Sequence, residues 1–533
     1  MKDYTSQIEK RRTFAIISHP DAGKTTLTEK FLLYGGAINL AGSVKGKATA
    51  RHAVSDWMEI EKQRGISVTS SVLQFSYDGY CINILDTPGH QDFSEDTYRT
   101  LMAADSAVMV IDGGKGVEAQ TRKLFKVCAM RHIPIFTFIN KLDRDARDSY
   151  ELIDEIEKEL GIPTCPVNWP IGSGKNFRGV FDRGTEKVLT FHDTQKGTKE
   201  GAWEEIALDD PHLADVISAE QRAQLEEEIE LLDGAAAEFD QEAVSRGELS
   251  PVFFGSALTN FGVETFLRHF LQMTAPPLPR MSDAGMIQAQ DPDFSAFVFK
   301  IQANMNKNHR DRVAFMRICS GRFDAEQEVL HVQGERTLRL QQPQQMMAEE
   351  RHVVSEAYAG DIIGVFDPGM FSIGDTVCVP GKKFRFEGIP TFAPEHFARV
   401  SLLDSMKRKQ FVKGIEQIAQ EGAIQIFRQV RGGMEEVIVG VVGVLQFDVL
   451  RFRLENEYNV DIRLDMLPYE YIRWIGNPQE TDTEKIVGTS DMKIVEDMKG
   501  NPLLLFVNAW SVGMVEERNP SLVLEEFGKA ETL

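Results

Sequence analysis

Short, mainly apolar runs of strand length recur along the first part of the chain, and each is bounded by turn or helical segments. The runs cover residues 13–17, 81–85, 106–111, 133–139 and 251–254. A segment with helical spacing, residues 25–33, follows the first run. Near-continuous apolar runs are typical of parallel strands buried on both faces of a sheet. The pattern therefore predicts a doubly wound α/β domain, with helices on both faces.

The extent of this domain follows from changes in composition. Glu, Ala and Leu recur at helical spacing between residues 202 and 239, which predicts a helical insertion near residues 190–250. The prolines of residues 275–280 cannot continue a helix, and they stiffen an extended linker. We therefore assign residues 1–280 to the first domain, with the insertion inside it.

Two smaller domains are expected after the linker. Residues 281–390 contain short β-type runs separated by glycine turns, which predicts a small antiparallel β-barrel. In residues 391–533 the order strand, helix, strand, strand, helix, strand predicts an α+β, ferredoxin-like domain.

Composition restricts the classes of protein to consider. The chain has 533 residues, 42% hydrophobic and 26% charged, which suits several folded domains and not a disordered chain. Its net charge of −22 argues against coating of nucleic acid or anionic membrane by bulk charge, so any RNA contact has to be local. The five scattered cysteines form no C-x-x-C pair, and the apolar run 437–447 is too short to cross a bilayer. These features predict a cytoplasmic protein without DNA or membrane partners.

A phosphate-binding loop is predicted between the first strand and the first helix. Residues 18–25 match the pattern G-x-x-x-x-G-K-[ST] except at the first position, where Ser18 replaces Gly. Backbone N–H groups and the helix N-terminus would face a β-phosphate, Lys24 would add charge between the β- and γ-phosphates, and Thr25 could coordinate Mg²⁺. The alternative is a tight strand-to-helix turn without a ligand. The predicted nucleotide-binding residues are Ser18, His19, Pro20, Asp21, Ala22, Gly23, Lys24 and Thr25.

A second polar motif follows the apolar run that ends at residue 85. It consists of Asp86, Thr87, Pro88, Gly89 and His90. A carboxylate at the end of a strand can hold a Mg²⁺-bound water, and Gly89 leaves its N–H free to approach a γ-phosphate. His90 has two interpretations: a hydrogen-bonded structural histidine, or, as we favour, the group that orients the attacking water.

A third motif is predicted to recognise the base. It consists of Asn140, Lys141, Leu142 and Asp143. The Asp143 carboxylate can accept from guanine N1–H and from the 2-amino group, whereas adenine offers neither donor and would leave a buried carboxylate unpaired. The expected ligand is therefore GTP or GDP. Ser256 and Ala257 follow the run 251–254 and are placed to offer backbone N–H groups to guanine O6.

Ser67 lies in a polar segment, residues 56–68, between the first two motifs. Its hydroxyl can supply a second Mg²⁺ ligand when the γ-phosphate is present, which makes this segment the predicted switch. The expected Mg²⁺ ligands are Thr25, Ser67 and, through water, Asp86. Residues 172–175 look like half of a phosphate loop, but no good helix follows them, so we interpret them as a surface turn.

Taken together, these motifs resemble those of the translational GTPases. Residues 64–67 are similar to the R-G-I-[TS] switch signature of that family, and residues 86–90 to its D-T-P-G-H motif. Residues 22–26 and 56–59 are similar to the branch that contains elongation factor G. The resemblance implies an α/β P-loop GTPase domain, a small antiparallel β-barrel and an α+β ferredoxin-like domain.

The resemblance also implies roles for individual residues. In this family, His90 would position water once the ribosome orders the site. Pro20 and Ile66 would flank the water as an apolar gate. Asp21 would help to balance charge at the bridge between the β- and γ-phosphates.

Because the chain ends soon after the third domain, the resemblance implies a ribosome-stimulated GTPase of translation termination. Such a factor drives class I release factors off the ribosome after peptide release. It is expected to be a monomer that contacts ribosomal RNA and proteins, and residues 407–409 are either one such contact or an ordinary solvated face. The alternatives are another ribosome-bound translational GTPase, or a metabolic P-loop GTPase that does not depend on ribosomes.

Overall fold

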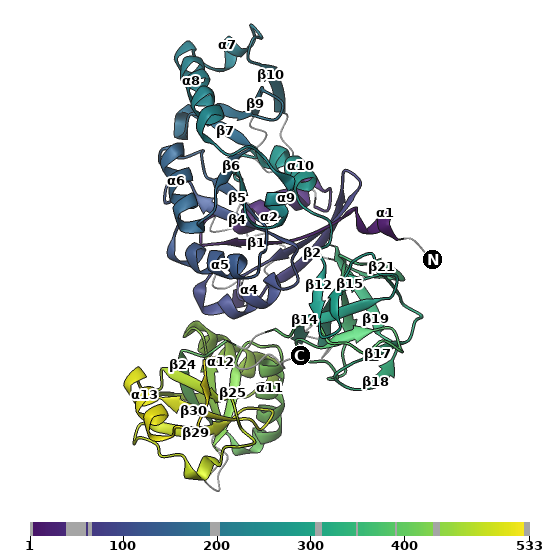
Figure 1. The fold of residues 1–533 in the computed structure, drawn as a ribbon, viewed down its shortest axis with the longest axis vertical. Helices are drawn as coiled ribbons and strands as arrows, with labels where there is room; N and C mark the ends of the chain where they lie inside the picture. Colours follow the sequence, from purple (N-terminus) through teal and green to yellow (C-terminus); the bar gives the residue numbers. More distant parts are fainter. Residues whose placement is uncertain are drawn as a thin grey trace.

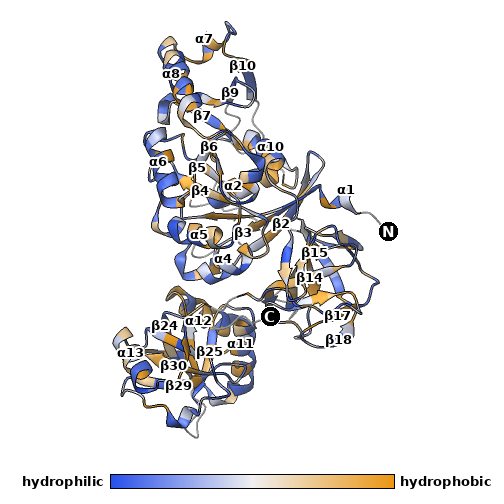
Figure 2. Ribbon diagram, viewed as in Figure 1, coloured by the Kyte–Doolittle hydropathy of each residue, from blue (hydrophilic) through white to orange (hydrophobic). Residues whose placement is uncertain are grey.

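The computed structural model describes residues 4–38, 60–61, 67–191, 203–303, 312–347, 350–389, 392–429 and 437–526. Figure 1 shows an α/β unit coloured purple to teal, an antiparallel β unit in green, and an α+β unit in yellow-green to yellow. This is the fold class that the sequence predicts. Figure 2 shows hydrophobic residues along the central strands of the three units.

The α/β unit is built on a seven-stranded sheet with the order β2-β3-β1-β4-β5-β11-β6. The strands are β1 (Arg11–Ser18), β2 (Ser71–Tyr77), β3 (Tyr80–Asp86), β4 (Ser106–Asp112), β5 (Ile135–Asn140), β6 (Thr164–Pro166) and β11 (Ser250–Phe254). Neighbouring strands are parallel except for β2 and β3. Helix α2 (Lys24–Tyr34) contacts α10 (Val263–Met273), and α5 (Ala119–Met130) contacts both α4 (Ser94–Leu101) and α6 (Ser149–Leu160).

Strand β1 shows why an apolar run forms the centre of this sheet. All of its residues are buried. Phe14 and Ile16 lie in an apolar cluster with residues of α2 and α10, whereas Ala15 and Ile17 lie in a separate cluster with residues of α5 and α6. Because side chains alternate along a strand, each residue of the run faces one of two helical layers. The loops that follow β1, β3, β5 and β11 therefore meet at one edge of the sheet.

The insertion before β11 differs from the helical prediction. It contains an antiparallel sheet of β7 (Asn168–Ile171), β8 (Gly179–Asp182), β9 (Lys187–Phe191) and β10 (Trp203–Ala207), then α7 (Leu213–Val216), α8 (Ala219–Ala235) and α9 (Gln241–Ser245). The helical prediction is wrong for residues 203–207, because pairing with β9 and burial of Ile206 outweigh local helix propensity. It is correct for α8, whose first turn has a capping box of Ser218 and Gln221.

The second unit is an antiparallel β structure, as predicted. Its strands are β12 (Arg280–Ser282), β13 (Gly285–Ile287), β14 (Ser295–Ala303), β15 (Arg312–Ser320), β16 (Arg322–Asp324), β17 (Val329–His331), β18 (Arg336–Leu338), β19 (Gln341–Met347), β20 (Glu350–Val353), β21 (Glu356–Tyr358), β22 (Ile362–Phe366) and β23 (Thr376–Cys378). Most join a sheet with the order β18-β17-β23-β14-β15-β22-β19-β20. Helix α1 (Thr5–Ile8) precedes β1 in the chain, but Ile8 packs in the core of this β unit.

The third unit begins with the predicted alternation of strands and helices. These elements are β24 (His396–Leu402), η4 (Ser405–Lys407), α11 (Arg408–Gln420), β25 (Gln425–Gln429), β26 (Val437–Val441), α12 (Leu445–Tyr458) and β27 (Ile462–Leu467). The chain then adds elements that the sequence analysis did not predict: β28 (Tyr471–Ile475), η5 (Thr483–Lys485), β29 (Met492–Glu496), β30 (Pro502–Phe506), α13 (Ala509–Arg518) and β31 (Leu524–Glu525). The added strands extend the sheet to the order β27-β24-β26-β25-β29-β30-β28-β31.

Candidate functional site

The phosphate-type loop between β1 and α2 has the backbone that its sequence requires. Gly23 is left-handed with φ of +102° and forms the N-cap of α2. A Cβ atom at Gly23 would lie 2.3 Å from the Asn140 Nδ2 atom, so no other residue fits without a shift. Ser18 is not among the described residues with positive φ, and its hydroxyl donates to the carbonyl oxygen of His19 at 2.9 Å. Serine at the first motif position therefore causes no left-handed strain.

The Asp86 motif meets this loop at the edge of the sheet. The Lys24 Nζ atom lies 2.6 Å from the Asp86 Oδ1 atom, and both side chains are buried. The Asp86 Oδ2 atom is also buried and has no hydrogen-bond partner among the residues that the structure describes. A Cβ atom on Gly89 would lie 3.5 Å from the Pro20 backbone, which shows how closely the two loops approach. The structure thus brings the first two motifs together and leaves one carboxylate oxygen able to take a further partner.

Asn140 connects the phosphate-type loop to the two loops on the base side. Its Nδ2 atom donates to the Ala22 carbonyl oxygen at 2.9 Å. Its Oδ1 atom accepts from the backbone N–H groups of Lys141 and Ala257, both at 2.8 Å. One buried amide therefore holds three loops in register.

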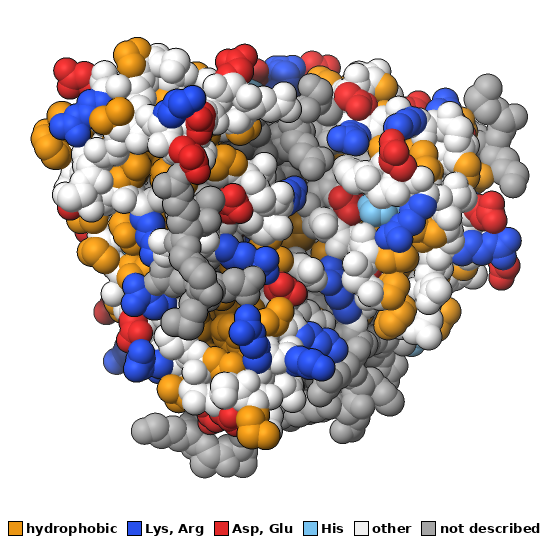
Figure 3. All heavy atoms as spheres, turned by 90° about the horizontal axis from the view of Figure 1, so that it is seen from below, with side chains coloured by type: hydrophobic (Ala, Val, Ile, Leu, Met, Phe, Trp, Pro, Cys, Tyr) orange, Lys and Arg blue, Asp and Glu red, His pale blue; other side chains and the backbone are white. Residues whose placement is uncertain are grey.

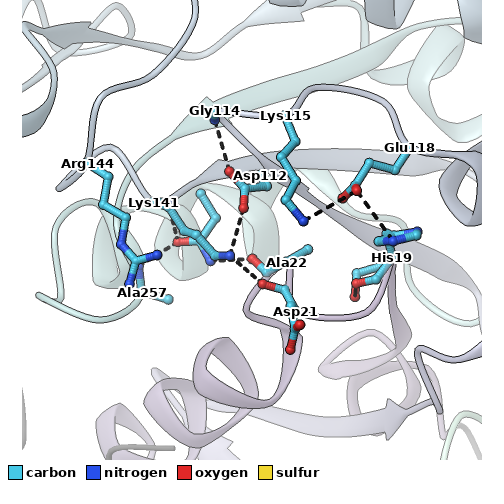
Figure 4. Close-up of polar contacts among 12 residues, drawn as sticks. His19, Asp21, Ala22, Asp112, Gly114, Lys115, Glu118, Lys141, Arg144 and Ala257 are labelled. Carbon is cyan, nitrogen blue, oxygen red and sulfur yellow. Dashed lines mark hydrogen bonds and ion pairs between the residues drawn. The ribbon is translucent and has the colours of Figure 1, made fainter. Parts of the chain in front are cut away.

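Lys141 strengthens the same connection. Its Nζ atom donates to the Asp21 carbonyl oxygen and to the Asp112 Oδ2 atom, the latter at 2.7 Å, as Figure 4 shows. Burial is the largest single effect and acts to raise the pKa of Asp112. The hydrogen bonds from Lys141 and from the Gly114 N–H, with the positive charges of Lys141 and Lys115, together outweigh it and hold this pKa below its usual range. A charged Asp112 thus fixes the position of the Lys141 side chain. Sequence reasoning missed Asp112, although it is the polar residue that ends the apolar run of β4.

Ser256 and Ala257 lie beside the base-side motif, but their backbone N–H groups are already bonded. Ser256 N–H donates to the Phe261 carbonyl oxygen at 2.9 Å, and Ala257 N–H donates to Asn140. The Ser256 hydroxyl donates to the Asp143 Oδ1 atom at 2.6 Å. In this structure the loop positions Asn140 and Asp143, and its contact with guanine O6 stays a prediction.

Residues 172–175 also pack against the base-side motif. Gly174 N–H donates to the carbonyl oxygens of Leu142 at 2.9 Å and Arg144 at 3.0 Å. The backbone of this turn therefore supports the motif that is predicted to hold guanine. The spacing of the motifs offered no sign of this contact.

His90 lies beside the start of the 3-10 helix η1 (Gln91–Phe93), and its side chain is 33% exposed. Its Nδ1 atom lies 3.2 Å from the Asp92 backbone N–H and 3.1 Å from the Asp92 Oδ1 atom. The ring is therefore hydrogen-bonded through one nitrogen, and Nε2 is on its opposite edge. Ser67 is half-buried, but residues 62–66 of the predicted switch, including Ile66, lie outside the described residues, as do residues 56–59.

Comparison with known families identifies the class of protein. The model of the elongation factor Tu GTP binding domain matches residues 9–276, that of elongation factor G domain 2 matches residues 293–380, and that of the class II release factor RF3 C-terminal domain matches residues 386–516. The chain is therefore a translational GTPase, an enzyme that hydrolyses GTP.

Two relatives identify the branch of this class. Peptide chain release factor 3 of Symbiobacterium thermophilum is 56% identical over 530 residues, covering 99% of this chain and 100% of the relative. The protein of the same name from Gloeobacter violaceus is 54% identical, covering 98% of each chain. The chain belongs to the peptide chain release factor 3 family. It is a GTPase that acts on the ribosome and recycles class I release factors in translation termination.

A solved structure agrees with the fold. A crystal structure of a protein from Thermus thermophilus superposes with a TM-score of 0.69 at 23% sequence identity, covering 87% of this chain and 69% of that chain. In the part of the chain that the structure describes, no helix is both long and apolar enough to cross a membrane.

The bridging role of Asn140 leads to a first prediction. We expect Asn140→Ala to weaken GDP binding by about 30- to 150-fold, because three hydrogen bonds worth about 1 kcal/mol each lose their partner. Displacement of a fluorescent GDP analogue measures this change. Asn140→Asp keeps the oxygen that accepts both N–H groups and should lose less affinity. Unchanged affinity for GDP in Asn140→Ala would show that the three loops keep their positions without the Asn140 amide.

Proposed function

We propose that GTP hydrolysis in this chain takes place between the phosphate-type loop, the Asp86 motif and His90. The observation that carries this proposal is the buried Asp86 Oδ2 atom. Lys24 contacts the other carboxylate oxygen, Oδ1, and Oδ2 has no partner among the described residues. A buried carboxylate oxygen without a partner is costly unless a ligand satisfies it. A cation with bound water, held against nucleotide phosphates, would supply that partner.

The predicted nucleotide-binding residues divide into two groups under this proposal. Residues 18–25 and 86–90 would surround the phosphates, since Gly89 approaches the Pro20 backbone. Residues 140–143 with Ser256 and Ala257 would hold guanine, since Ser256 and Asn140 fix the base-side loops. The bond from Asn140 to Ala22 keeps the two groups at a constant separation.

The donor set fits Mg²⁺. Thr25 and Ser67 would supply hydroxyl oxygens, and Asp86 would act through water, which suits a hard cation that keeps part of its hydration shell. Mg²⁺ bound there would neutralise charge on the β- and γ-phosphate oxygens.

In the reaction, a water attacks the γ-phosphorus, the bond to the bridging oxygen breaks, and GDP and inorganic phosphate form. His90 would orient this water through Nε2, because Nδ1 is held by Asp92. Lys24 would exchange its contact with Asp86 for phosphate oxygens, and Pro20 and Ile66 would limit access of other water. Asp21 would help to balance charge at the bridging oxygen.

The test of this proposal is how nucleotide binding depends on the Mg²⁺ concentration in variants of the proposed ligands. We expect Thr25→Ala to raise the Mg²⁺ concentration needed for tight binding of both GDP and GTP by at least about tenfold. Ser67→Ala should raise it for GTP alone, because its ligation is proposed to require the γ-phosphate. Release of fluorescent GDP and a non-hydrolysable GTP analogue, titrated with Mg²⁺ or EDTA, measures both effects.

Thr26→Ala is the matched control, since it removes a neighbouring hydroxyl that lies outside the proposed ligand set. Equal Mg²⁺ dependence in Thr25→Ala and Thr26→Ala would refute the assignment of the cation site.

We further propose that the factor acts as a cytoplasmic monomer with domains at residues 1–280, 281–390 and 391–533. Figure 3 shows Lys and Arg side chains distributed over one face of this acidic protein, interspersed with Asp and Glu. Arg408, Lys409 and Lys413 line a groove between α11 and the loop at residues 366–369. Such local cations can meet ribosomal phosphates despite the net charge, and Lys407, Arg408 and Lys409 are the proposed contact.

A further inference from the structure

Asp92 lies between His90 and the first turn of helix α12, and it is not one of the predicted site residues. Its side chain is 7% exposed. The Oδ1 atom lies 3.1 Å from the His90 Nδ1 atom, and the Oδ2 atom accepts from the Leu445 backbone N–H at 2.8 Å. One carboxylate therefore connects the proposed catalytic imidazole to the C-terminal unit.

The approach of α12 to Asp92 depends on a glycine. A Cβ atom on Gly443 would lie 2.2 Å from the Asp92 Cγ atom and 2.4 Å from its Cα atom. Contacts this short do not occur between real atoms, so a larger residue at this position would push the two segments apart. Gly443 and Leu445 thus form a surface that fits the Asp92 side chain. The first N–H groups of a helix have no partner within the helix, which favours a carboxylate at this place.

Apolar contacts continue the same interface. Phe93, the residue after Asp92, packs in a buried cluster with Val68 and with Val449 of α12. Farther along, the Arg99 Nη2 atom donates to the Gly422 carbonyl oxygen at 2.9 Å. The segment that carries His90 is therefore anchored to the C-terminal unit at several points. Two residues of this interface lie against the imidazole: Phe93, whose ring centroid is 6.2 Å from that of His90, and Asp92, which is its polar partner.

We propose that Asp92 is a positioning residue that couples docking of the C-terminal unit to the orientation of His90. This inference rests on the proposed role of His90. Asp92 offers Nδ1 two alternative partners: its backbone N–H donates to an unprotonated Nδ1, and its carboxylate accepts from a protonated one. Either hydrogen bond fixes the rotation of the ring and directs Nε2 away from Asp92. The carboxylate is itself held in place by Leu445 N–H. When α12 moves away from η1, Asp92 loses this anchor and the imidazole loses its fixed orientation, so hydrolysis slows while the nucleotide stays bound.

The test uses the full-length factor, purified ribosomes and GTP. We expect Asp92→Ala to lower the kcat of ribosome-stimulated GTP hydrolysis by about tenfold or more, since an oriented acid–base group contributes about 10²- to 10⁴-fold. The affinity for GTP and the ribosome concentration at half-maximal rate should change by less than about twofold, because Asp92 contacts neither the phosphate-type loop nor the base-side motif. A general loss of structure would change all three quantities and the thermal unfolding midpoint.

Three further variants separate positioning from a structural effect. Asp92→Asn keeps an oxygen for Leu445 N–H and a polar group beside Nδ1, so it should recover part of the lost kcat. Gly443→Ala leaves Asp92 intact but displaces α12, so it should reproduce the loss in Asp92→Ala. Gln91→Ala removes an exposed side chain of the same 3-10 helix and serves as the matched control.

The double variant His90→Ala with Asp92→Ala decides whether Asp92 acts through His90. If it does, the double variant is no slower than His90→Ala alone, because residues that act as a unit are not additive. Additive losses, or an Asp92→Ala variant with normal kcat, would overturn the coupling and leave the role of His90 standing. Normal hydrolysis in His90→Ala would instead overturn the proposed function, so the two failures are distinguishable.

Discussion

Replacement of His90 by Ala is expected to lower ribosome-stimulated GTP hydrolysis by at least about 10²-fold, because a positioned group that orders the attacking water is lost. The affinities for GTP and GDP should stay within about twofold of the original, since the ring is bonded to Asp92 and to no residue of the phosphate-type loop in the described structure. Phosphate release after rapid mixing with ribosomes measures the first quantity, and equilibrium binding of labelled nucleotides measures the second.

The companion variant is His90→Gln, which keeps a side chain able to hydrogen-bond water and should retain more activity than His90→Ala. Turnover by His90→Ala at the original rate would assign His90 to the structural interpretation instead. In that case its bonds with Asp92 would serve only to cap η1.

Asp143→Asn should change which nucleotide the protein binds. The Ser256 hydroxyl already donates to the Asp143 Oδ1 atom, so in the variant this hydroxyl holds the amide oxygen and the amide N–H₂ group faces the base. That group would oppose the N1–H and 2-amino donors of guanine. Loss of two charge-assisted hydrogen bonds predicts affinity for GDP weaker by roughly 10²- to 10³-fold. Xanthine has a carbonyl oxygen in place of the 2-amino group, and this oxygen can accept from the amide N–H₂ group. Xanthosine diphosphate (XDP) should therefore bind the variant more tightly than GDP does.

Competition of GDP and XDP against a fluorescent nucleotide gives both affinities. Asp145→Asn is the control, because it makes the same chemical change at an exposed position two residues away. A variant at residue 143 that still prefers GDP would show that the base is recognised elsewhere.

The sequence predicted β1, β3, β4, β5 and β11 well because each contains a mainly apolar run, such as residues 14–17 of β1. The prediction failed for β10. Residues 203–207 form a strand because they pair with β9, and the local composition of residues 203–207 does not reveal that pairing. The extra strands after β27 were missed for a similar reason. Their burial depends on pairing within the C-terminal sheet, for example of β29 with β25.

The candidate site also has a part that the sequence predicted and a part that it did not. Its three motifs are short and follow strands, so their order alone indicated a nucleotide site. The residues that support these motifs could not be predicted, because their contacts join distant parts of the chain. Asp92 and Leu445, for example, are 353 positions apart. The donors of the Ser256 loop were predicted to face guanine, and only the folded backbone shows that Asn140 already occupies one of them.

The three-way connection made by Asn140 also has a consequence for how the protein folds. Its side chain bonds to residues 118 and 117 positions away, so these bonds form only after β1, β5 and β11 have joined the same sheet. Closure of such long loops is slow, and the base-side pocket is therefore completed late in folding. A nucleotide that binds only the completed pocket raises the free energy of unfolding of the α/β unit by mass action. The cellular supply of guanine nucleotides thus acts as a folding ligand for this unit, apart from its use as substrate.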